Sequence, residues 1–198
     1  MGRRGFVALA TLAAALAAPD EHRGAGAAEP RLATDAEAEP LFALVDALAA
    51  DPLAPAEEIA ALVGVPLPRD ALYGRGAYPR DGREASIPRD SPLARLGATR
   101  FELRRPLFAG ATWWLLSLDL DARDAPSPVP MAAVLARYGR PDGIAPATTI
   151  PIHPAPLFEA TTALSYRRPW GRLVFAVADA APGRPVRGVT LRDGGGSP

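Results

Sequence analysis

Two stretches of the chain follow the same plan, and this internal repetition limits the possible folds more than any other feature of the sequence. A helical pattern starts near Pro55 and stops at a Gly-x-Pro triplet at residues 64–66. The same pattern starts at Pro130 and stops at a second Gly-x-Pro triplet at residues 139–141, 75 positions later. Proline suits the first turn of a helix and glycine suits the residue after the last turn, so both segments are predicted to be helices. The apolar stripes are formed by Ile59, Leu62 and Val63 in the first helix and by Val134, Leu135 and Tyr138 in the second.

Each helical pattern is followed by two strand patterns in the same order. Residues 101–106 and 164–169 both end in Arg-Arg-Pro, and an apolar strand that ends in aspartate follows each of them, over 113–119 and 173–179. The equivalent positions lie 75, 63 and 60 residues apart, and the spacing shrinks only where loops are expected. The pattern predicts an α+β protein, a tandem repeat of helix plus antiparallel β-sheet arranged in two layers.

This plan predicts where the structural units begin and end. The first copy includes another helix, near residues 41–48, and a long loop rich in proline, glycine and arginine over residues 68–97. The second copy opens with a proline-rich linker and closes with a strand over 186–191. The predicted units are a signal peptide (1–28), a spacer (29–40), the first α+β repeat (41–124), the second α+β repeat (125–192) and a disordered tail (193–198).

The first 28 residues have the pattern of an export signal. Arg3 and Arg4 precede a mildly apolar run over residues 5–18, which is too short to span a bilayer as a helix, and small residues follow it. The order Arg-Arg-x and then two apolar residues is typical of twin-arginine export, while an ordinary basic signal start and a retained membrane anchor are the alternatives. We expect a periplasmic or secreted protein with no stable membrane span after signal cleavage.

The composition excludes several classes of function. All 22 basic residues are arginine, and they balance 22 acidic residues to a formal net charge of +0, so no nucleic-acid partner is expected. The chain has no cysteine, which excludes disulfides, thiolate zinc sites and iron-sulfur clusters. Hydrophobic residues make up 48% of the chain, enough for a packed core and more than disordered chains carry.

The succession of elements resembles a known kind of envelope protein. A helix closed by Gly-x-Pro, a hairpin with an aromatic and aliphatic second strand, and Gly-Arg-Pro-Val-Arg-Gly-Val at residues 183–189 are similar to the exported modules of the SmpA/OmlA-like lipoproteins. The doubling is similar to the tandem modules of the β-lactamase inhibitory proteins. The resemblance covers about residues 41–192 and implies an exported protein that binds other proteins. Because the lipid-bearing cysteine and the two disulfides of these families are missing, lipid tethering is excluded and β-lactamase inhibition is one of several implied roles.

No pattern of residues indicates catalysis, and we expect no enzyme, cofactor or metal. His153 lies among prolines, without a nucleophile elbow or a cysteine elsewhere, so a hydrolase that uses it is the least favoured alternative. Asp119, Asp121 and Asp124 could present oxygens to a cation, but the glycine and the terminal glutamate of a calcium loop are missing. A charged strand end that leads into a turn explains this run without a metal.

Alternation along residues 113–120 separates two faces of a predicted strand. Trp114, Leu116, Leu118 and Leu120 form a wholly apolar face that should meet the helices, while Trp113 lies on the mixed face. Tryptophan beside arginine is typical of binding hot spots, so we expect a protein partner in the cell envelope or outside the cell. The candidate partner-binding residues are Trp113, Arg104, Arg105, Tyr166, Arg167 and Arg168. The alternative is that the long loop covers Trp113 and that the arginine pairs are solvated strand ends.

A second functional hypothesis uses the long loop. Its aromatic residues could hold a small ligand or a cell-wall fragment, and its arginines could bind anionic groups. The candidate ligand-binding residues are Tyr73, Arg75, Tyr78 and Arg80.

Overall fold

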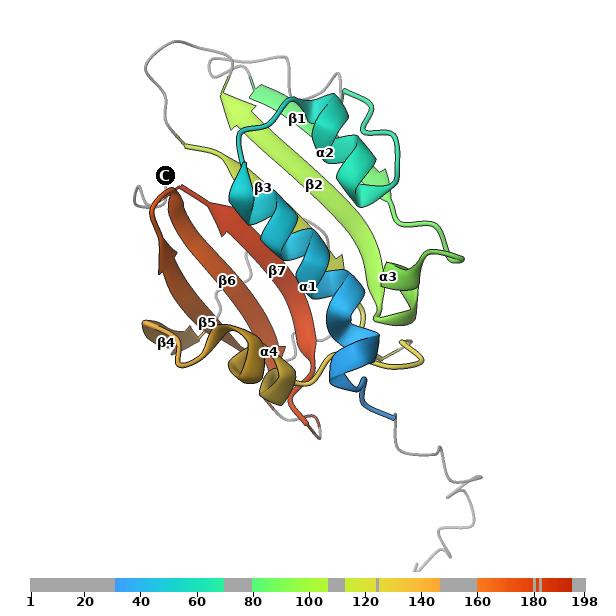
Figure 1. The fold of residues 1–198 in the computed structure, drawn as a ribbon, viewed down its shortest axis with the longest axis vertical. Helices are drawn as coiled ribbons and strands as arrows, with labels where there is room; N and C mark the ends of the chain where they lie inside the picture. Colours follow the sequence, from blue (N-terminus) through green and yellow to red (C-terminus); the bar gives the residue numbers. More distant parts are fainter. Residues whose placement is uncertain are drawn as a thin grey trace, which may run out of the picture.

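In the computed structural model, the seven strands of the described residues pair in one antiparallel sheet (Figure 1). The structure describes residues 31–69, 80–106, 113–123, 125–146, 160–179, 181 and 183–193. Within them, the sheet order is β1-β2-β3-β7-β6-β5-β4. The strands are β1 (Arg80–Ser86), β2 (Ala98–Pro106), β3 (Leu115–Leu120), β4 (Gly143–Pro146), β5 (Thr161–Arg168), β6 (Gly171–Ala178) and β7 (Val186–Arg192).

Two meanders make up this sheet. The strands β1, β2 and β3 pair in chain order, and so do β4, β5, β6 and β7. The meanders are joined where β3 pairs with β7, with Leu116 opposite Leu191 and Leu118 opposite Val189. Together with the helices, the sheet confirms the predicted α+β class.

The two repeated helical segments are helices with the predicted ends. The described helices are α1 (Asp35–Ala50), α2 (Ala56–Val63), α3 (Pro92–Arg95) and α4 (Met131–Tyr138). Helix α2 follows Pro55 and ends at Gly64, and α4 follows Pro130 and ends at Gly139. These glycines have φ of +78° and +76°, a region that residues with a Cβ rarely adopt. None of the described helices is long and apolar enough to cross a membrane.

Helix α1 starts earlier than predicted, because residues 35–40 of the expected spacer are helical. Its start is fixed by a capping box, in which the Glu37 backbone N–H donates to Thr34 Oγ1 (3.3 Å) and the Thr34 N–H donates to Glu37 Oε2 (2.9 Å). These hydrogen bonds satisfy two backbone donors that would otherwise lack partners at the helix end. The Thr-x-x-Glu pattern of residues 34–37 is the sequence signal for this earlier start.

The expected long loop at residues 68–97 is partly wrong, since β1 and α3 lie within it. Strand β1 is polar, with the sequence Arg-Asp-Gly-Arg-Glu-Ala-Ser, and has no apolar alternation that could reveal it. It is an edge strand whose backbone pairs with β2 in unbroken register from Arg80 to Ser86. Polar, charged sequences are common on edge strands because they discourage pairing with other chains.

The core lies between the helices and one face of the sheet. Figure 1 shows α1 crossing the sheet in front of β3 and β7, with α2 and α4 on the same side. The predicted apolar face of β3 is confirmed, because Trp114, Leu116, Leu118 and Leu120 are all buried. Trp114 also contacts Trp170, in the turn between β5 and β6, with ring centroids 5.6 Å apart. Of the predicted helix stripes, Leu62 is the exception, with 47% of its surface exposed.

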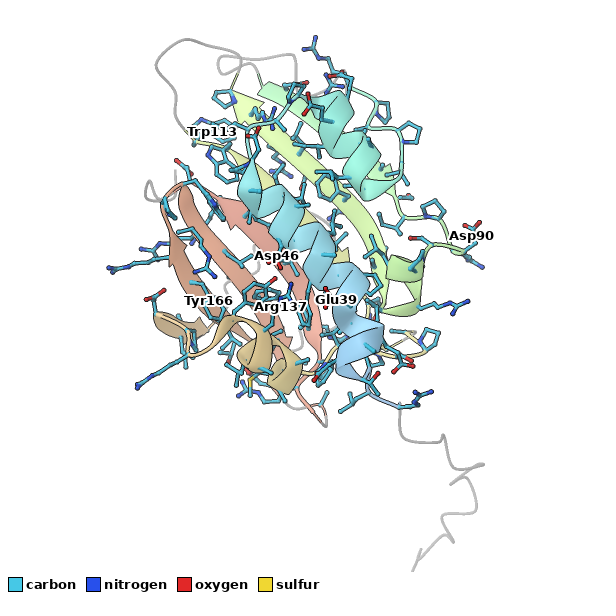
Figure 2. The ribbon with its side chains drawn as sticks, viewed as in Figure 1. Glu39, Asp46, Asp90, Trp113, Arg137 and Tyr166 are labelled. Carbon is cyan, nitrogen blue, oxygen red and sulfur yellow. The ribbon has the colours of Figure 1, made fainter. Side chains whose placement is uncertain are left out.

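An aromatic cluster fastens α4 to the core. The ring of Tyr138 lies 5.8 Å from Phe42 of α1, 5.8 Å from Tyr166 of β5 and 5.2 Å from Phe175 of β6. The Tyr138 hydroxyl donates to Asp46 Oδ1 on α1 (3.0 Å), and Arg137 donates to the other oxygen of Asp46 (2.6 Å; Figure 2). Burial, followed by the nearby Asp46 carboxylate, raises the pKa of the Tyr138 hydroxyl above its ordinary value.

The substitution Tyr138→Phe should reduce the loss of stability in alkaline solution. The unfolded chain releases this tyrosine proton near pH 10. The pKa of Tyr138 is raised in the folded state. The contribution of its protonated hydroxyl to the free energy of unfolding is therefore fully present below about pH 10, and it is lost as the pH rises towards the pKa of the folded state. The chain has neither lysine nor cysteine, so tyrosines dominate this pH range. The measurement is the free energy of unfolding in urea at a series of pH values from about 8 to 11.

A smaller alkaline slope should remain in the variant, since burial also raises the pKa of Tyr166. Equal slopes in the variant and the parent protein would contradict this role of Tyr138.

Candidate functional site: an arginine row on the helix-free sheet face

The face of the sheet opposite the helices is built from the residues that alternate with the core positions. We call it the helix-free face. It carries residues 100, 102 and 104 of β2, 115, 117 and 119 of β3, 188, 190 and 192 of β7, 172, 174 and 176 of β6, and 163, 165 and 167 of β5. Most of these side chains are only half-buried, unlike their neighbours on the helix-covered face.

Arginines line up across this face at one level of the sheet. Strand pairing places Arg104 opposite Leu115, Leu115 opposite Arg192, Arg192 opposite Arg172, and Arg172 opposite Arg167. We call the four arginines of β2, β7, β6 and β5 the arginine row. Adjacent strands lie about 4.8 Å apart, so the arginines of β7, β6 and β5 are near neighbours, while Leu115 of β3 separates them from Arg104.

Three members of the row carry no described counter-ion. Arg167 and Arg172 are exposed and Arg192 is half-buried, and none of their guanidinium groups forms an ion pair within the described part of the chain. Arg104 differs, because its Nε donates to the buried carboxylate of Glu102. Like charges directly opposite each other destabilise a sheet, so the arrangement has a cost that a bound anion would offset.

Beyond the arginine row, the helix-free face is lined mostly by short side chains. One level is formed by Ser117, Thr190, Val174 and Ser165, and the next by Asp119, Gly188, Ala176 and Ala163. Short side chains leave few projections, so a broad partner could approach the backbone closely here. The combination of a flat floor and a charged border suits a macromolecule better than a small ligand.

The carboxylates on β3 and just after it already have partners. Asp119 Oδ2 accepts from Arg100 Nη2 (2.6 Å), and Asp121 Oδ1 accepts from Arg123 (3.2 Å) and Arg187 (3.3 Å). Burial alone would raise the pKa of Asp121, but the hydrogen bonds from Arg123 and the charge of Arg187 keep it below its ordinary value. In the described residues, no three histidine, aspartate or glutamate side chains are close enough to hold a metal ion.

The predicted partner-binding residues divide between the two faces of the sheet. Arg104 and Arg167 lie on the helix-free face, and half-buried Trp113 precedes β3 (Figure 2). The prediction is wrong for Tyr166, which alternation turns into the core, where it is 2% exposed. Arg168 lies over the ring of Tyr166, with its guanidinium carbon 5.8 Å from the ring centroid.

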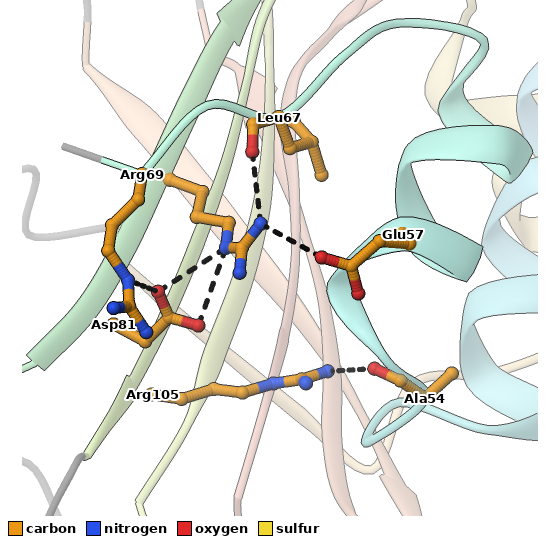
Figure 3. A network of polar contacts seen from close by, with 7 residues as sticks. Ala54, Glu57, Leu67, Arg69, Asp81 and Arg105 are labelled. Carbon is orange, nitrogen blue, oxygen red and sulfur yellow. Dashed lines mark hydrogen bonds and ion pairs between the residues drawn. The ribbon is translucent and has the colours of Figure 1, made fainter.

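Arg105 also belongs to the helix-covered side. Its guanidinium donates to the carbonyl oxygens of Pro52 (3.1 Å) and Ala54 (2.8 Å), as Figure 3 shows for Ala54. Burial lowers the pKa of Arg105 from its ordinary value. The residue ties β2 to the segment between α1 and α2, so these contacts use its guanidinium within the fold.

A polar network beside Arg105 explains why this region holds so many arginines. Arg83 donates to Asp81 (3.3 Å), to Glu57 of α2 (3.4 Å) and to the Leu67 carbonyl (3.2 Å), and Arg69 donates to Asp81 (3.1 Å; Figure 3). These contacts fasten α2 to the edge of the sheet. The charged groups of this network are therefore paired with one another within the fold.

Several predicted residues lie outside the described part of the chain. They are Tyr73, Arg75, Tyr78, His153 and Asp124, together with the signal segment. Arg80 begins β1, but its side chain is not described. The structure therefore does not test the small-ligand and hydrolase alternatives.

Sequence reasoning missed Arg172 and Arg192, two central members of the row. Arg172 directly follows the glycine that begins β6, and Arg192 ends β7. Alternation within each strand could have assigned them to the outer face, but only the register between strands shows that they are neighbours. Comparisons with family models, with curated proteins and with solved structures find no match for this chain.

The substitution Arg172→Gln should stabilise the protein, because it removes the central charge of three adjacent arginines and keeps much of the apolar stem. We expect the free energy of unfolding to rise by about 0.2–1 kcal/mol at low ionic strength. The gain should nearly vanish in about 1 M salt, where the charges are screened. Urea unfolding at both ionic strengths measures it.

Arg89→Gln is the matched control, since Arg89 is exposed in a turn and has no described ion pair. Its effect should be smaller than that of Arg172→Gln. A lower free energy of unfolding for Arg172→Gln than for the parent protein at low ionic strength would contradict repulsion among the three adjacent arginines.

Proposed function

We propose that the protein is a non-enzymatic binding module that captures an acidic segment of a partner protein on its helix-free face. The observation that carries the proposal is the arginine row, in which Arg167, Arg172 and Arg192 are adjacent and lack described counter-ions. Arginine binds carboxylates through two parallel hydrogen bonds, which gives both affinity and orientation. Aspartate and glutamate side chains on a partner would supply the counter-ions for these arginines.

The overall charge supports a local attraction. The chain has a formal net charge of +0, so the row is a positive patch on a protein that does not attract anions as a whole. Such patches raise association rates and fix the orientation of the partner. Trp113, which lies just before β3, would add the aromatic contact area typical of hot spots.

We further propose that the fold is a two-layer tandem repeat. In this arrangement α2-β1-β2-β3 corresponds to α4-β5-β6-β7, with β4 as an added edge strand. A two-fold axis between Ser117 and Thr190, which lie opposite each other, would relate β3 to β7 and β2 to β6. This correspondence differs by one strand from the one expected from the Arg-Arg-Pro motifs. The antiparallel pairing of β3 with β7 supports it, because two-fold symmetry relates antiparallel neighbours.

An exported location is part of the proposal. It rests on Arg3, Arg4 and the short apolar run that follows them. When the full chain is expressed in bacteria, we expect a periplasmic or secreted form whose N-terminus follows Ala17 or Ala28. N-terminal sequencing of the fractionated protein measures this. An unprocessed chain in the cytoplasm or in the membrane fraction would contradict it.

Binding of an oligoglutamate peptide tests the capture of acidic partners. Fluorescence anisotropy of the labelled peptide should show binding that weakens at least about tenfold in the triple variant Arg167→Gln/Arg172→Gln/Arg192→Gln. Two or three lost ion pairs account for that loss even on an exposed surface. Affinity should also fall with rising salt. Trp113→Ala should weaken binding while the protein remains folded.

The control is the triple variant Arg89→Gln/Arg95→Gln/Arg140→Gln, which loses the same charge from exposed sites off this face. It should bind the peptide about as well as the parent protein. If both triple variants lose the same affinity for the peptide, net charge alone explains the loss, and the proposed site is overturned. An oligonucleotide of equal charge that binds as tightly as the peptide would contradict a protein partner.

A further inference from the structure

A second site lies on the helix-covered side, at the opposite surface from the arginine row. An open groove of about 590 Å³ runs between α4 and the strands β4 and β5. This volume is typical of small-molecule sites. Ile144 of β4 is 68% exposed at this edge and is part of the groove lining. The apolar lining is formed by Met131, Leu135, Ile144 and Leu164, and the arginines of the lining are Arg140 and Arg184.

The two arginines come from the same short motif, used twice. Arg140 is the middle residue of Gly139-Arg140-Pro141, and Arg184 is the middle residue of Gly183-Arg184-Pro185. The first triplet ends α4 and the second precedes β7, yet both arginines line one groove. Two residues with cationic side chains therefore lie along a groove whose lining is mostly apolar.

The backbone holds Arg184 in an unusual conformation. Its φ is +47°, and it is the only described residue other than glycine with a positive φ. The Met131 N–H, at the start of α4, donates to the carbonyl oxygens of both Gly183 (3.2 Å) and Arg184 (3.1 Å). Such strain persists only where the surroundings enforce it, and it is concentrated at functional sites.

The guanidinium of Arg184 is only partly satisfied. Its Nη2 donates to Asp179 Oδ1 (2.7 Å), but its Nε is buried and has no acceptor among the described residues. Asp179 also accepts from the Thr162 hydroxyl, and this hydrogen bond, followed by that from Arg184, keeps the pKa of Asp179 below its ordinary value. A buried donor without an acceptor is costly. The Arg184 side chain as a whole is 37% exposed, so a carboxylate in the groove would meet its uncovered part and not the Nε.

We propose that this groove binds a small amphipathic carboxylate. The hydrocarbon part lies against Leu135, Ile144 and Leu164, and the carboxylate accepts hydrogen bonds from Arg184, with Arg140 at the same groove adding positive charge. The chemistry of the lining favours an anionic head over a neutral or cationic one. The site is independent of the arginine row.

Titration calorimetry with three ligands of equal chain length tests the proposal. Decanoate should bind, decanol should bind at least about tenfold more weakly, and decyltrimethylammonium should bind no better than decanol. All three are used below the concentrations at which they aggregate. Equal binding of decanol and decanoate, or no binding of decanoate, overturns the proposal.

Variants assign the binding to this groove. Arg184→Gln should weaken decanoate binding at least about tenfold, and Arg140→Gln and Ile144→Ser should each weaken it several-fold. Arg89→Gln and Arg172→Gln are controls that should leave it unchanged. Circular dichroism verifies that each variant is folded. If Arg184→Gln does not fold, the decanoate affinities of Arg140→Gln and Ile144→Ser, which change exposed side chains, test the proposal. Unchanged affinity in both of those variants overturns the proposal.

Discussion

The pairing of β3 with β7 is the interaction on which the rest of the structure depends. Without it, the chain would form one meander of three strands and another of four, each with a small apolar face. The fraction of the surface that a chain buries on folding rises with the size of the folded unit, so the joined sheet buries more than the separate meanders could. The pairing aligns Leu116 with Leu191 and Leu118 with Val189, and α1 packs over these residues through Leu44, Val45 and Leu48. The core is therefore shared, and α1 covers the line where the meanders meet.

The arginines of the sheet have two roles, one on each face. On the helix-covered side, Arg83 and Arg105 are used to fasten α2 and the segment before it, through carboxylates and backbone carbonyls. On the other side, the register between β7, β6 and β5 places three arginines in adjacent positions without described counter-ions. A chain whose only basic residue is arginine uses it both for packing and for an exposed charged surface. Burial and partners, and not residue type, distinguish the two uses.

The sequence predicted those features that depend on neighbouring residues. Proline and glycine signals gave both ends of α2 and α4, and alternation gave the faces of β3. The same alternation, applied to β5, would have placed Tyr166 inside and Arg167 outside. The polar β1 and the four-residue β4 could not be predicted because neither carries the apolar alternation that identifies a strand. The arginine row was beyond local reasoning, since Arg172 and Arg192 become neighbours only through the register of β6 and β7.

The contact between Trp114 and Trp170 has a spectroscopic consequence. It brings two indoles from separate meanders to a centroid distance of 5.6 Å with their planes inclined by 53°. Chromophores at that separation and tilt couple their electronic transitions, which produces a paired positive and negative band in circular dichroism. This optical signal would appear only when the two meanders have docked. The protein thus carries an optical reporter of whether its two meanders are docked.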